Sequence, residues 1–307
     1  MPFAPTEARG ATRSRRRTLA LMLGIPALRR ILRAADPIPV RLAISASVIG
    51  DVNLNDAKAA MLIWLKRMAQ DMNIQFDPKL FATTPEIVEG IRKGQLDCVA
   101  LNVLEYRPIA DFLDSSQIVN ASGEAGTEQY LILAKRNSAI RNLADLKGRR
   151  LCVLKTPKMC VAPAWLLTVL DEAHYGPAEQ FFGSVVNDSK VARVVLPVFF
   201  GQADACLTTK RGFDTMCELN PQVGRDLFVL ASSPPMVVDF YIFRKNYRNA
   251  YREKVINAIM SLHATVAGQQ LATLFQFQEL TIRDASCLGS VLAVLDRADR
   301  ARARLRD

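Results

Sequence analysis

Residues 41–101 contain the stretch that decides the fold class. It opens with a short strand-like run, RLAIS at Arg41–Ser45, and closes with LDCVAL at Leu96–Leu101, which is apolar enough to be buried on both faces. Between them, Asn53 and Asp56 resemble a capping box, and apolar residues then recur at helical spacing. A strand over Ile74–Phe81 and a helix from Thr84 to Lys93 complete the pattern. Strand, helix, strand, helix and strand predict a parallel sheet with right-handed crossovers.

The same alternation restarts near residue 130. Strands are predicted over Tyr130–Ala134, Arg149–Leu154, Phe182–Val186, Ala203–Leu207, Leu227–Ala231 and Val237–Phe243, and helices over Lys158–Ala173, Ser189–Phe200 and Thr209–Leu219. From Asn246 onward the pattern predicts helices only. No low-complexity linker separates the two units, so we expect two α/β domains joined by short crossings.

Charge is concentrated at the two ends of the sequence. The chain has 307 residues, 50% of them hydrophobic, and a net charge of +10. Residues 1–33 carry eight Arg and one Glu, about +7, and residues 293–307 carry five Arg and three Asp, about +2. The body between them is nearly neutral, which argues against a basic nucleic-acid-binding face. The hydrophobic content excludes wholesale disorder.

The amino terminus has the anatomy of an export signal. Ser14–Leu19 (SRRRTL) resembles a twin-arginine motif, and the ten-residue apolar run Leu19–Leu28 is too short to span a bilayer. Small residues at Ala34 and Ala35 predict cleavage near Ala35. We therefore predict a signal peptide over residues 1–35 and a periplasmic mature protein. The alternative interpretation of this segment is a basic disordered arm. If it is an export signal, the choice between the Tat and Sec export routes stays open.

Motifs for catalysis or metal binding are absent from the sequence. None of the six cysteines forms a CxxC pair, and no GxSxG, HExxH or P-loop pattern occurs. We therefore expect no enzyme, no metal and no cofactor. The one enzyme alternative is Cys160, because Lys155 and Lys158 upstream and a predicted helix start lower a thiol pKa. Whether any cysteines pair as disulfides stays open.

Four segments in order resemble one family of binding proteins. They are Gly94–Tyr106 (GQLDCVALNVLEY), Asn142–Arg150 (NLADLKGRR), Phe181–Gly183 with Phe200–Ala205 (FGQADA), and Ser232–Pro235 with Asp239 and Arg244-Lys245. Their order and spacing are similar to the phosphate/phosphite/phosphonate periplasmic solute-binding proteins of ABC transporters, over about residues 40 to 280.

The resemblance implies a type 2 periplasmic binding protein fold. Residues 36–128 and 238–307 would form domain 1 and residues 129–237 domain 2, each a mainly parallel sheet flanked by helices. A ligand would bind in the cleft between them, beyond the carboxyl ends of the strands. Closure about the two crossings would bury it.

The resemblance also implies site residues. Tyr106 and Asp239 match a cleft tyrosine and an aspartate of the family. The family's hydroxyl-rich anion loop falls on Lys158, Met159, Cys160 and Val161, where Lys158 and helix N–H groups would replace the hydroxyls. A cleft histidine falls near Ser189 and Lys190. The cleft candidates by position alone are Ser45, Ser47, Asn102, Thr208 and Thr209.

The expected ligand is small and anionic. Lys155, Lys158, Lys190 and Arg211 fall near strand-to-helix junctions of the middle unit, against the single expected acid Asp239. We expect a monomer that delivers its ligand to the membrane permease of an ABC importer. A sensory module that partners a membrane signalling protein is the alternative, and the sequence does not name the ligand.

Overall fold

The computed structural model describes residues 39–50 and 52–305. The predicted signal peptide, residues 1–35, lies outside the described residues. No helix in the described part of the chain is both long enough and apolar enough to cross a bilayer. The described residues all belong to one compact unit by their contacts.

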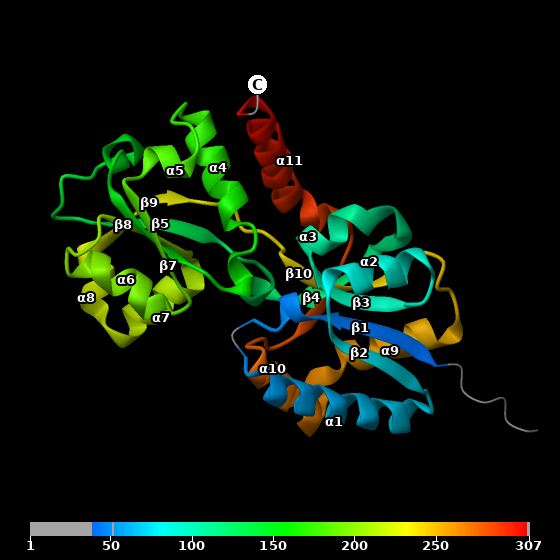
Figure 1. Ribbon diagram of the computed structural model, residues 1–307. Helices are drawn as coiled ribbons and strands as arrows, with labels where there is room; N and C mark the ends of the chain where they lie inside the picture. Colours follow the sequence, from blue (N-terminus) through cyan, green and yellow to red (C-terminus); the bar gives the residue numbers. More distant parts are fainter. Residues whose placement is uncertain (1–38, 51, 306–307) are drawn as a thin grey trace, which may run out of the picture. The chain divides into compact units, whose positions relative to one another are not determined.

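A six-stranded sheet is built from strands of the first part of the chain and from two strands near its end. Its strands are β1 (Val40–Ser45), β2 (Phe76–Ala82), β3 (Cys98–Asn102), β4 (Leu113–Ala121), β10 (Asp239–Arg244) and β11 (Leu280–Arg283), in the order β11-β4-β10-β3-β1-β2. Strand β1 runs parallel to β2 and β3, whereas β10 is antiparallel to β3 and β4, and β11 is antiparallel to β4. The sheet therefore has a parallel half and an antiparallel half (Figure 1).

The middle of the chain forms a five-stranded sheet. Its strands are β5 (Tyr130–Lys135), β6 (Arg150–Leu154), β7 (Ser184–Asp188), β8 (Ala205–Thr209) and β9 (Leu227–Ser232), in the order β7-β6-β8-β5-β9. Strand β6 is parallel to β7 and β8, and β5 is antiparallel to β8 and β9.

The α/β two-sheet fold is confirmed, but both sheets are mixed rather than mainly parallel. Strands β5 and β10 follow direct crossings of the chain from one sheet to the other. A parallel neighbour needs a crossover connection, usually a helix, whereas an antiparallel neighbour does not. Strands β5 and β10 enter their sheets without such a helix, and both run antiparallel to their neighbours. The prediction of helices alone after Asn246 is wrong at β11, a four-residue strand at the sheet's edge.

Eleven helices are assigned within the described residues. They are α1 (Leu54–Met72), α2 (Thr84–Arg92), α3 (Val103–Tyr106), α4 (Ala162–Glu172), α5 (Ala178–Phe181), α6 (Val191–Phe199), α7 (Lys210–Leu219), α8 (Pro221–Asp226), α9 (Ala250–Met260), α10 (Val266–Leu274) and α11 (Gly289–Arg304). Helix α1 begins as predicted: the Asn53 side chain accepts hydrogen bonds from the backbone N–H groups of Asn55 at 2.9 Å and Asp56 at 3.3 Å.

Helix α4 begins later than the sequence predicted. The expected start was Lys158, but residues Pro157–Met159 form a separate 3-10 turn and α4 begins at Ala162. Each of the two segments has a proline in its first turn, Pro157 and Pro163, where the missing N–H costs nothing. Lys158 therefore lies in a turn and not in the first turn of a long helix.

Helices α1, α9 and α10 cover one face of the six-stranded sheet, and α2 and α3 lie on the other (Figure 1). The second face belongs to a single large apolar cluster that continues through α4 and α11 into the five-stranded sheet. The first face has two smaller clusters, one with Leu65 and Val255 and one with Met61 and Leu271. The interior is thus continuous on one face and divided on the other.

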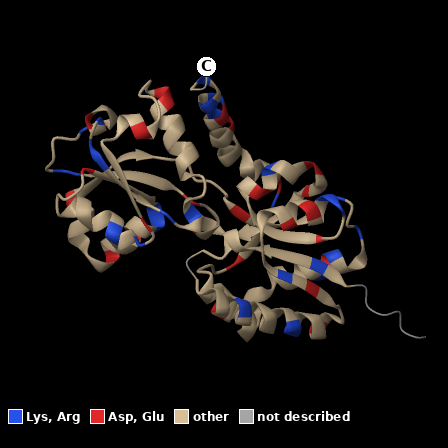
Figure 2. Cartoon of the chain, viewed as in Figure 1, with Lys and Arg blue, Asp and Glu red and all other residues tan. Residues whose placement is uncertain are grey.

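Helix α11 is joined by ion pairs to both halves of the chain. Arg107 contacts Asp296 at 2.7 Å and Asp299 at 2.8 Å, and Arg297 contacts Glu172 of α4 at 3.0 Å. Basic and acidic positions are interspersed over the described elements (Figure 2). The division into domains at residues 128/129 and 237/238 stays a prediction.

Candidate functional site

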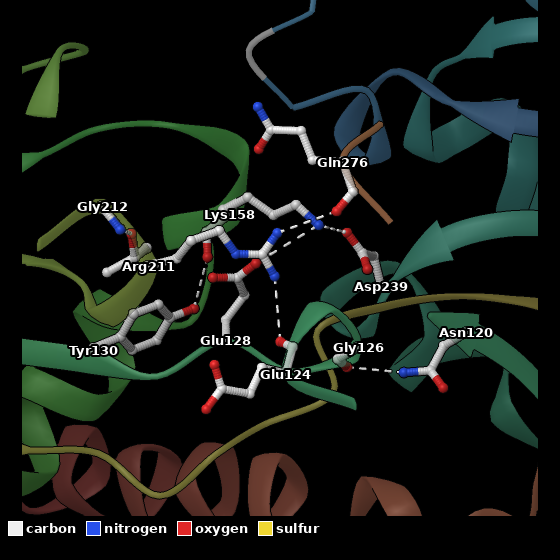
Figure 3. A network of polar contacts seen from close by, with 11 residues as sticks. Asn120, Glu124, Gly126, Glu128, Tyr130, Lys158, Arg211, Gly212, Asp239 and Gln276 are labelled. Carbon is white, nitrogen blue, oxygen red and sulfur yellow. Dashed lines mark hydrogen bonds and ion pairs between the residues drawn. The ribbon is translucent and has the colours of Figure 1, made fainter. Parts of the chain in front are cut away.

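Four charged side chains converge between segments far apart in the sequence. Lys158 comes from the turn after β6, and Arg211 from the first turn of α7. Asp239 is the first residue of β10, and Glu128 lies two residues before β5 (Figure 3). The Nζ atom of Lys158 lies 2.5 Å from Oδ2 of Asp239 and 3.7 Å from Oε1 of Glu128. Two of the predicted site residues, Lys158 and Asp239, are therefore in direct contact.

Local hydrogen bonds hold the backbone segments that carry Lys158 and Arg211. The Tyr130 hydroxyl donates a hydrogen bond of 2.9 Å to the carbonyl oxygen of Lys158, which anchors the turn. Thr209 caps α7, because its Oγ1 accepts a 3.1 Å hydrogen bond from the N–H of Gly212. A Cβ at Gly212 would lie 3.0 Å from that Oγ1, so a side chain there would crowd the cap that sets Arg211 in its place.

Burial and charge act in opposite directions on Lys158 and Glu128. Glu128 is only 4% exposed, and burial raises its pKa despite the opposing charges of Lys158 and Arg211. For Lys158, burial alone would lower the pKa, but the charges of Asp239 and Glu128 outweigh it and raise the pKa. Lys158 is therefore a cation at neutral pH.

Arg211 has backbone partners. Its guanidinium donates to the carbonyl oxygens of Glu124 at 3.2 Å and Gln276 at 3.5 Å (Figure 3). Among the described residues, no carboxylate lies within ion-pair distance of Arg211. Its positive charge is therefore not neutralised by a direct partner.

A cavity of about 390 Å³ opens beside this cluster. Its polar lining includes Asn120, Lys158, Arg211, Asp239 and Gln276, and most of the remaining lining is apolar. This volume falls within the usual range of ligand pockets, which combine an apolar wall with a few polar groups.

Three predicted site residues lie instead around a carboxylate that the sequence did not indicate. Glu105 is 3% exposed and accepts hydrogen bonds from the hydroxyls of Ser45 and Ser47, each at 2.7 Å. Thr84 donates to it at 2.8 Å, and the backbone N–H of Asn102 at 3.1 Å. The Asn102 side chain caps α3. The hydroxyls of Ser45 and Ser47 and the Oδ1 atom of Asn102 thus have partners within the protein.

Tyr106 and Met159 are packed in the apolar interior. The Tyr106 ring meets Phe240 edge-on, and its hydroxyl shares a 2.8 Å hydrogen bond with Ser115. Met159 is 4% exposed. The structure does not bring either side chain to the Lys158–Asp239 pair.

Cys160 does not have the lowered thiol pKa that the sequence predicted. Burial and the charge of Asp239 raise its pKa to about 12, although Lys158 acts in the opposite direction. The expected lowering is wrong because burial outweighs the charge of Lys158, which is itself paired with carboxylates, and because α4 begins two residues further on. A thiol with this pKa stays protonated and is a weak nucleophile.

The remaining predicted residues are dispersed. Ser189 and Lys190 are exposed, and the Lys190 backbone N–H donates to Asp188 at 2.8 Å. Thr208 is fully buried, and its Oγ1 has no hydrogen-bond partner in the described part of the chain. None of the three residues lines the 390 Å³ cavity.

The site has one more acidic residue than the sequence predicts. Asp239 was expected as the single acid, but Glu128 also faces Lys158. The sequence could have suggested Glu128, because it lies just before the predicted strand at Tyr130, where the chain crosses between the domains at the predicted cleft. Glu105 and Gln276 had no comparable signal, since their roles depend on contacts between distant segments.

In the described residues, no group of three or more His, Cys, Asp or Glu side chains is placed to hold an ion. The six cysteines are all free.

Comparison with known proteins gives a consistent result. The family model for "ABC transporter, phosphonate, periplasmic substrate-binding protein" matches residues 47–286. No curated protein matches the sequence.

Solved structures share the fold at low sequence identity. A Xanthomonas citri protein bound to ATP has a TM-score of 0.62 at 13% identity, covering 86% of this chain and 98% of that one. A binding protein component of an ABC phosphonate transporter from Pseudomonas aeruginosa has a TM-score of 0.56 at 17% identity, covering 88% and 89%. PhnD1 of Prochlorococcus marinus, in complex with methylphosphonate, has a TM-score of 0.56 at 14% identity, covering 85% and 98%. These identities establish the fold alone.

Proposed function

We propose a ligand class and a binding mode from one premise: the chain belongs to the periplasmic substrate-binding proteins of phosphonate ABC transporters. Members of this family bind a solute and work with the permease of an ABC transporter, and membership implies a periplasmic place of action. The ligand that we propose is a small compound with a phosphonate- or phosphate-like anionic group. The methylphosphonate in the PhnD1 structure supports this class.

The observation that carries the proposal is the placement of Lys158 and Arg211 on the wall of one cavity. Both are cationic, and the partners of Arg211 among the described residues are backbone carbonyls. An oxyanion that replaced these carbonyls, or shared Lys158 with Asp239, would gain charge-assisted hydrogen bonds of about 1.5–3 kcal/mol each. Asp239 would then accept from a protonated oxygen or an amino group of the ligand.

The acids limit how much negative charge the site accepts. Glu128 and Asp239 offset the charges of Lys158 and Arg211, so the site is nearly neutral as a whole. A singly charged head group is favoured over a highly charged one, because each added negative charge also meets these two carboxylates.

A thermal-shift screen tests the ligand class. Phosphate, methylphosphonate, alkanesulfonates, ATP and a cationic amino acid are added to the mature protein at increasing concentration. A ligand at 100 times its dissociation constant stabilises by about 2.7 kcal/mol. We expect a phosphonate or phosphate to give the largest rise in Tm. Stabilisation by the cationic amino acid alone would overturn the anionic assignment.

The oligomeric state, the cleavage site and the domain closure are further proposals. We propose that the chain acts as a monomer, that its precursor is cleaved near Ala35, and that domains 36–128 plus 238–307 and 129–237 close on the ligand. Mass spectrometry of periplasmic protein tests the cleavage, since a mature chain that retains residues 18–28 would contradict it. Small-angle scattering tests closure and the oligomeric state, since an unchanged radius of gyration on ligand binding would contradict the hinge.

We propose no catalytic activity for the chain. The raised pKa of the Cys160 thiol opposes a nucleophilic role. Turnover of any ligand from the screen, lost in Cys160→Ser, would contradict this. The transport role is tested by the ATPase activity of the transporter, which the ligand-loaded protein should stimulate. If the loaded protein leaves this ATPase activity unchanged but activates a membrane signalling protein, the sensory alternative is supported.

A further inference from the structure

The cavity beside Lys158 extends along one face of the six-stranded sheet. Alternate residues of neighbouring strands line it, with Leu42 and Ile44 from β1, Ala100 from β3 and Tyr241 from β10. Their register puts Ile44 opposite Ala100 and Ala100 opposite Tyr241. Because side chains alternate across a strand, Asp239 points to the same face as Tyr241.

Three helices form the opposite wall of the cavity. The lining residues from α1 are Met61, Trp64 and Met68, those from α9 are Val255 and Ile259, and those from α10 are Leu271 and Leu274. This is the face on which the apolar interior is divided into two clusters, and members of both clusters line the cavity. The cavity therefore lies where a continuous core would be expected.

The side chains on this face confirm that the space is accessible. Ile44, Trp64, Phe76 and Tyr241 are only partly buried although they point inward between sheet and helices. An apolar cavity of about 150 Å³ already stays dry and takes up benzene. The present cavity has about 390 Å³, so a larger apolar group fits it.

The polar lining gathers at one end. Lys158 contacts Asp239, and Arg211 contacts the backbone of Gln276. Asp239 pairs with Asn102, whereas Leu42 in the apolar part pairs with Cys98, four residues back along the same strand. At about 3.3 Å per residue, the apolar part extends roughly 13 Å from the charged end.

We propose that the ligand is an amphiphile: a singly charged oxyanion head held at Lys158 and Arg211, with an alkyl chain that lies along the sheet face in the cavity. This inference rests on the proposed function and specifies its ligand class. A short phosphonate fills only the charged end, while a longer chain also removes its methylene groups from water against Trp64, Ala100 and Ile259.

Calorimetric titration with methyl-, butyl- and octylphosphonate tests the tail. Each buried methylene is expected to tighten binding by about threefold to fourfold, so octylphosphonate should bind far more tightly than methylphosphonate. Equal affinities across the series would overturn this inference and leave the proposed function intact. Failure of all three to bind would overturn this inference, and failure of phosphate as well would overturn the proposed function. Octanol, which has the chain without the charge, should bind much more weakly than octylphosphonate, and equal binding would contradict the charged head site.

A substitution pair locates the tail. Ala100→Leu projects three added carbons into the cavity, and Ala59→Leu makes the same change on the exposed side of α1. We expect Ala100→Leu to reduce the octyl-to-methyl affinity ratio by at least about tenfold, and Ala59→Leu to leave it unchanged. An unchanged ratio in folded Ala100→Leu would place the chain elsewhere. If that variant does not fold, the chain-length series in the natural protein still decides the question.

Discussion

Two polar clusters lie at the same edge of the six-stranded sheet and are built in opposite ways. Around Glu105, the hydroxyls of Ser45, Ser47 and Thr84 all donate to one buried carboxylate. Around Lys158, two cations and Asp239 lie on the wall of a large cavity, and the buried Glu128 faces Lys158 from behind that wall. The first cluster has its hydrogen bonds made within the protein, whereas the second holds charge beside open space.

The comparison shows why position at a strand end does not identify a binding residue. Both clusters lie where parallel-sheet proteins bind their ligands. A donor that already has a charged acceptor gains little from a ligand, because binding only exchanges one partner for another. We therefore assign stability to the Glu105 cluster and ligand binding to the Lys158 cluster, and the predictions below separate the two.

The largest effect is expected for Glu105→Gln. The amide group replaces one acceptor oxygen with a donor, so buried hydroxyls lose their partner, and the free energy of unfolding should fall by about 3 kcal/mol. Urea denaturation measures the change. Glu218→Gln, on an exposed residue of α7, is the matched control and should leave stability nearly unchanged. A loss below about 0.5 kcal/mol for Glu105→Gln would contradict the assignment.

A smaller loss is expected for Ser47→Ala. It removes the hydrogen bond to the Glu105 carboxylate, which should cost about 1.5 kcal/mol, and also an acceptor 2.9 Å from the Ser45 hydroxyl, which keeps Glu105 as its partner. Ligand affinity, measured by calorimetry on the same variant, should not change. A normal stability together with weakened ligand binding would return Ser47 to the binding site that the sequence suggested for it.

The smallest effect concerns pH. Burial raises the pKa of Glu128 above its ordinary value of 4.5, so the folded protein keeps this proton to a higher pH than the unfolded chain does. This contribution to stability is present below the ordinary pKa and is lost as pH rises through the raised one. Glu128→Gln cannot titrate, so its Tm relative to the natural protein should rise over that window. A difference in Tm that is constant with pH would contradict the raised pKa.

Much of the fold was predictable because it depends on local patterns. The helical spacing after Asn53 and the apolar run ending at Leu101 correspond to α1 and β3. Strands β4 and β11 were not predicted, and neither were the directions of β5 and β10. Residues 114–117 of β4 are polar and β11 has only four residues, so neither strand shows a clear apolar periodicity. The direction of β5 and β10 depends on how the chain crosses between the sheets.

The site was predictable only in part. Lys158 and Asp239 were both expected, and the structure joins them although 81 residues separate them in sequence. Glu105 could not be found, because its function follows from four donors on different segments. The cavity was equally hidden, since an apolar residue that lines a cavity and one that fills a core give the same sequence pattern.

Isothermal titration of the best phosphonate or phosphate ligand into Lys158→Met and Lys190→Met tests the central claim most directly. Lys158 is on the cavity wall, whereas Lys190 is an exposed lysine away from the lining. We predict that Lys158→Met weakens binding at least ~10-fold, about 1.4 kcal/mol, and that Lys190→Met leaves it within about twofold. Unchanged affinity in folded Lys158→Met would contradict the account.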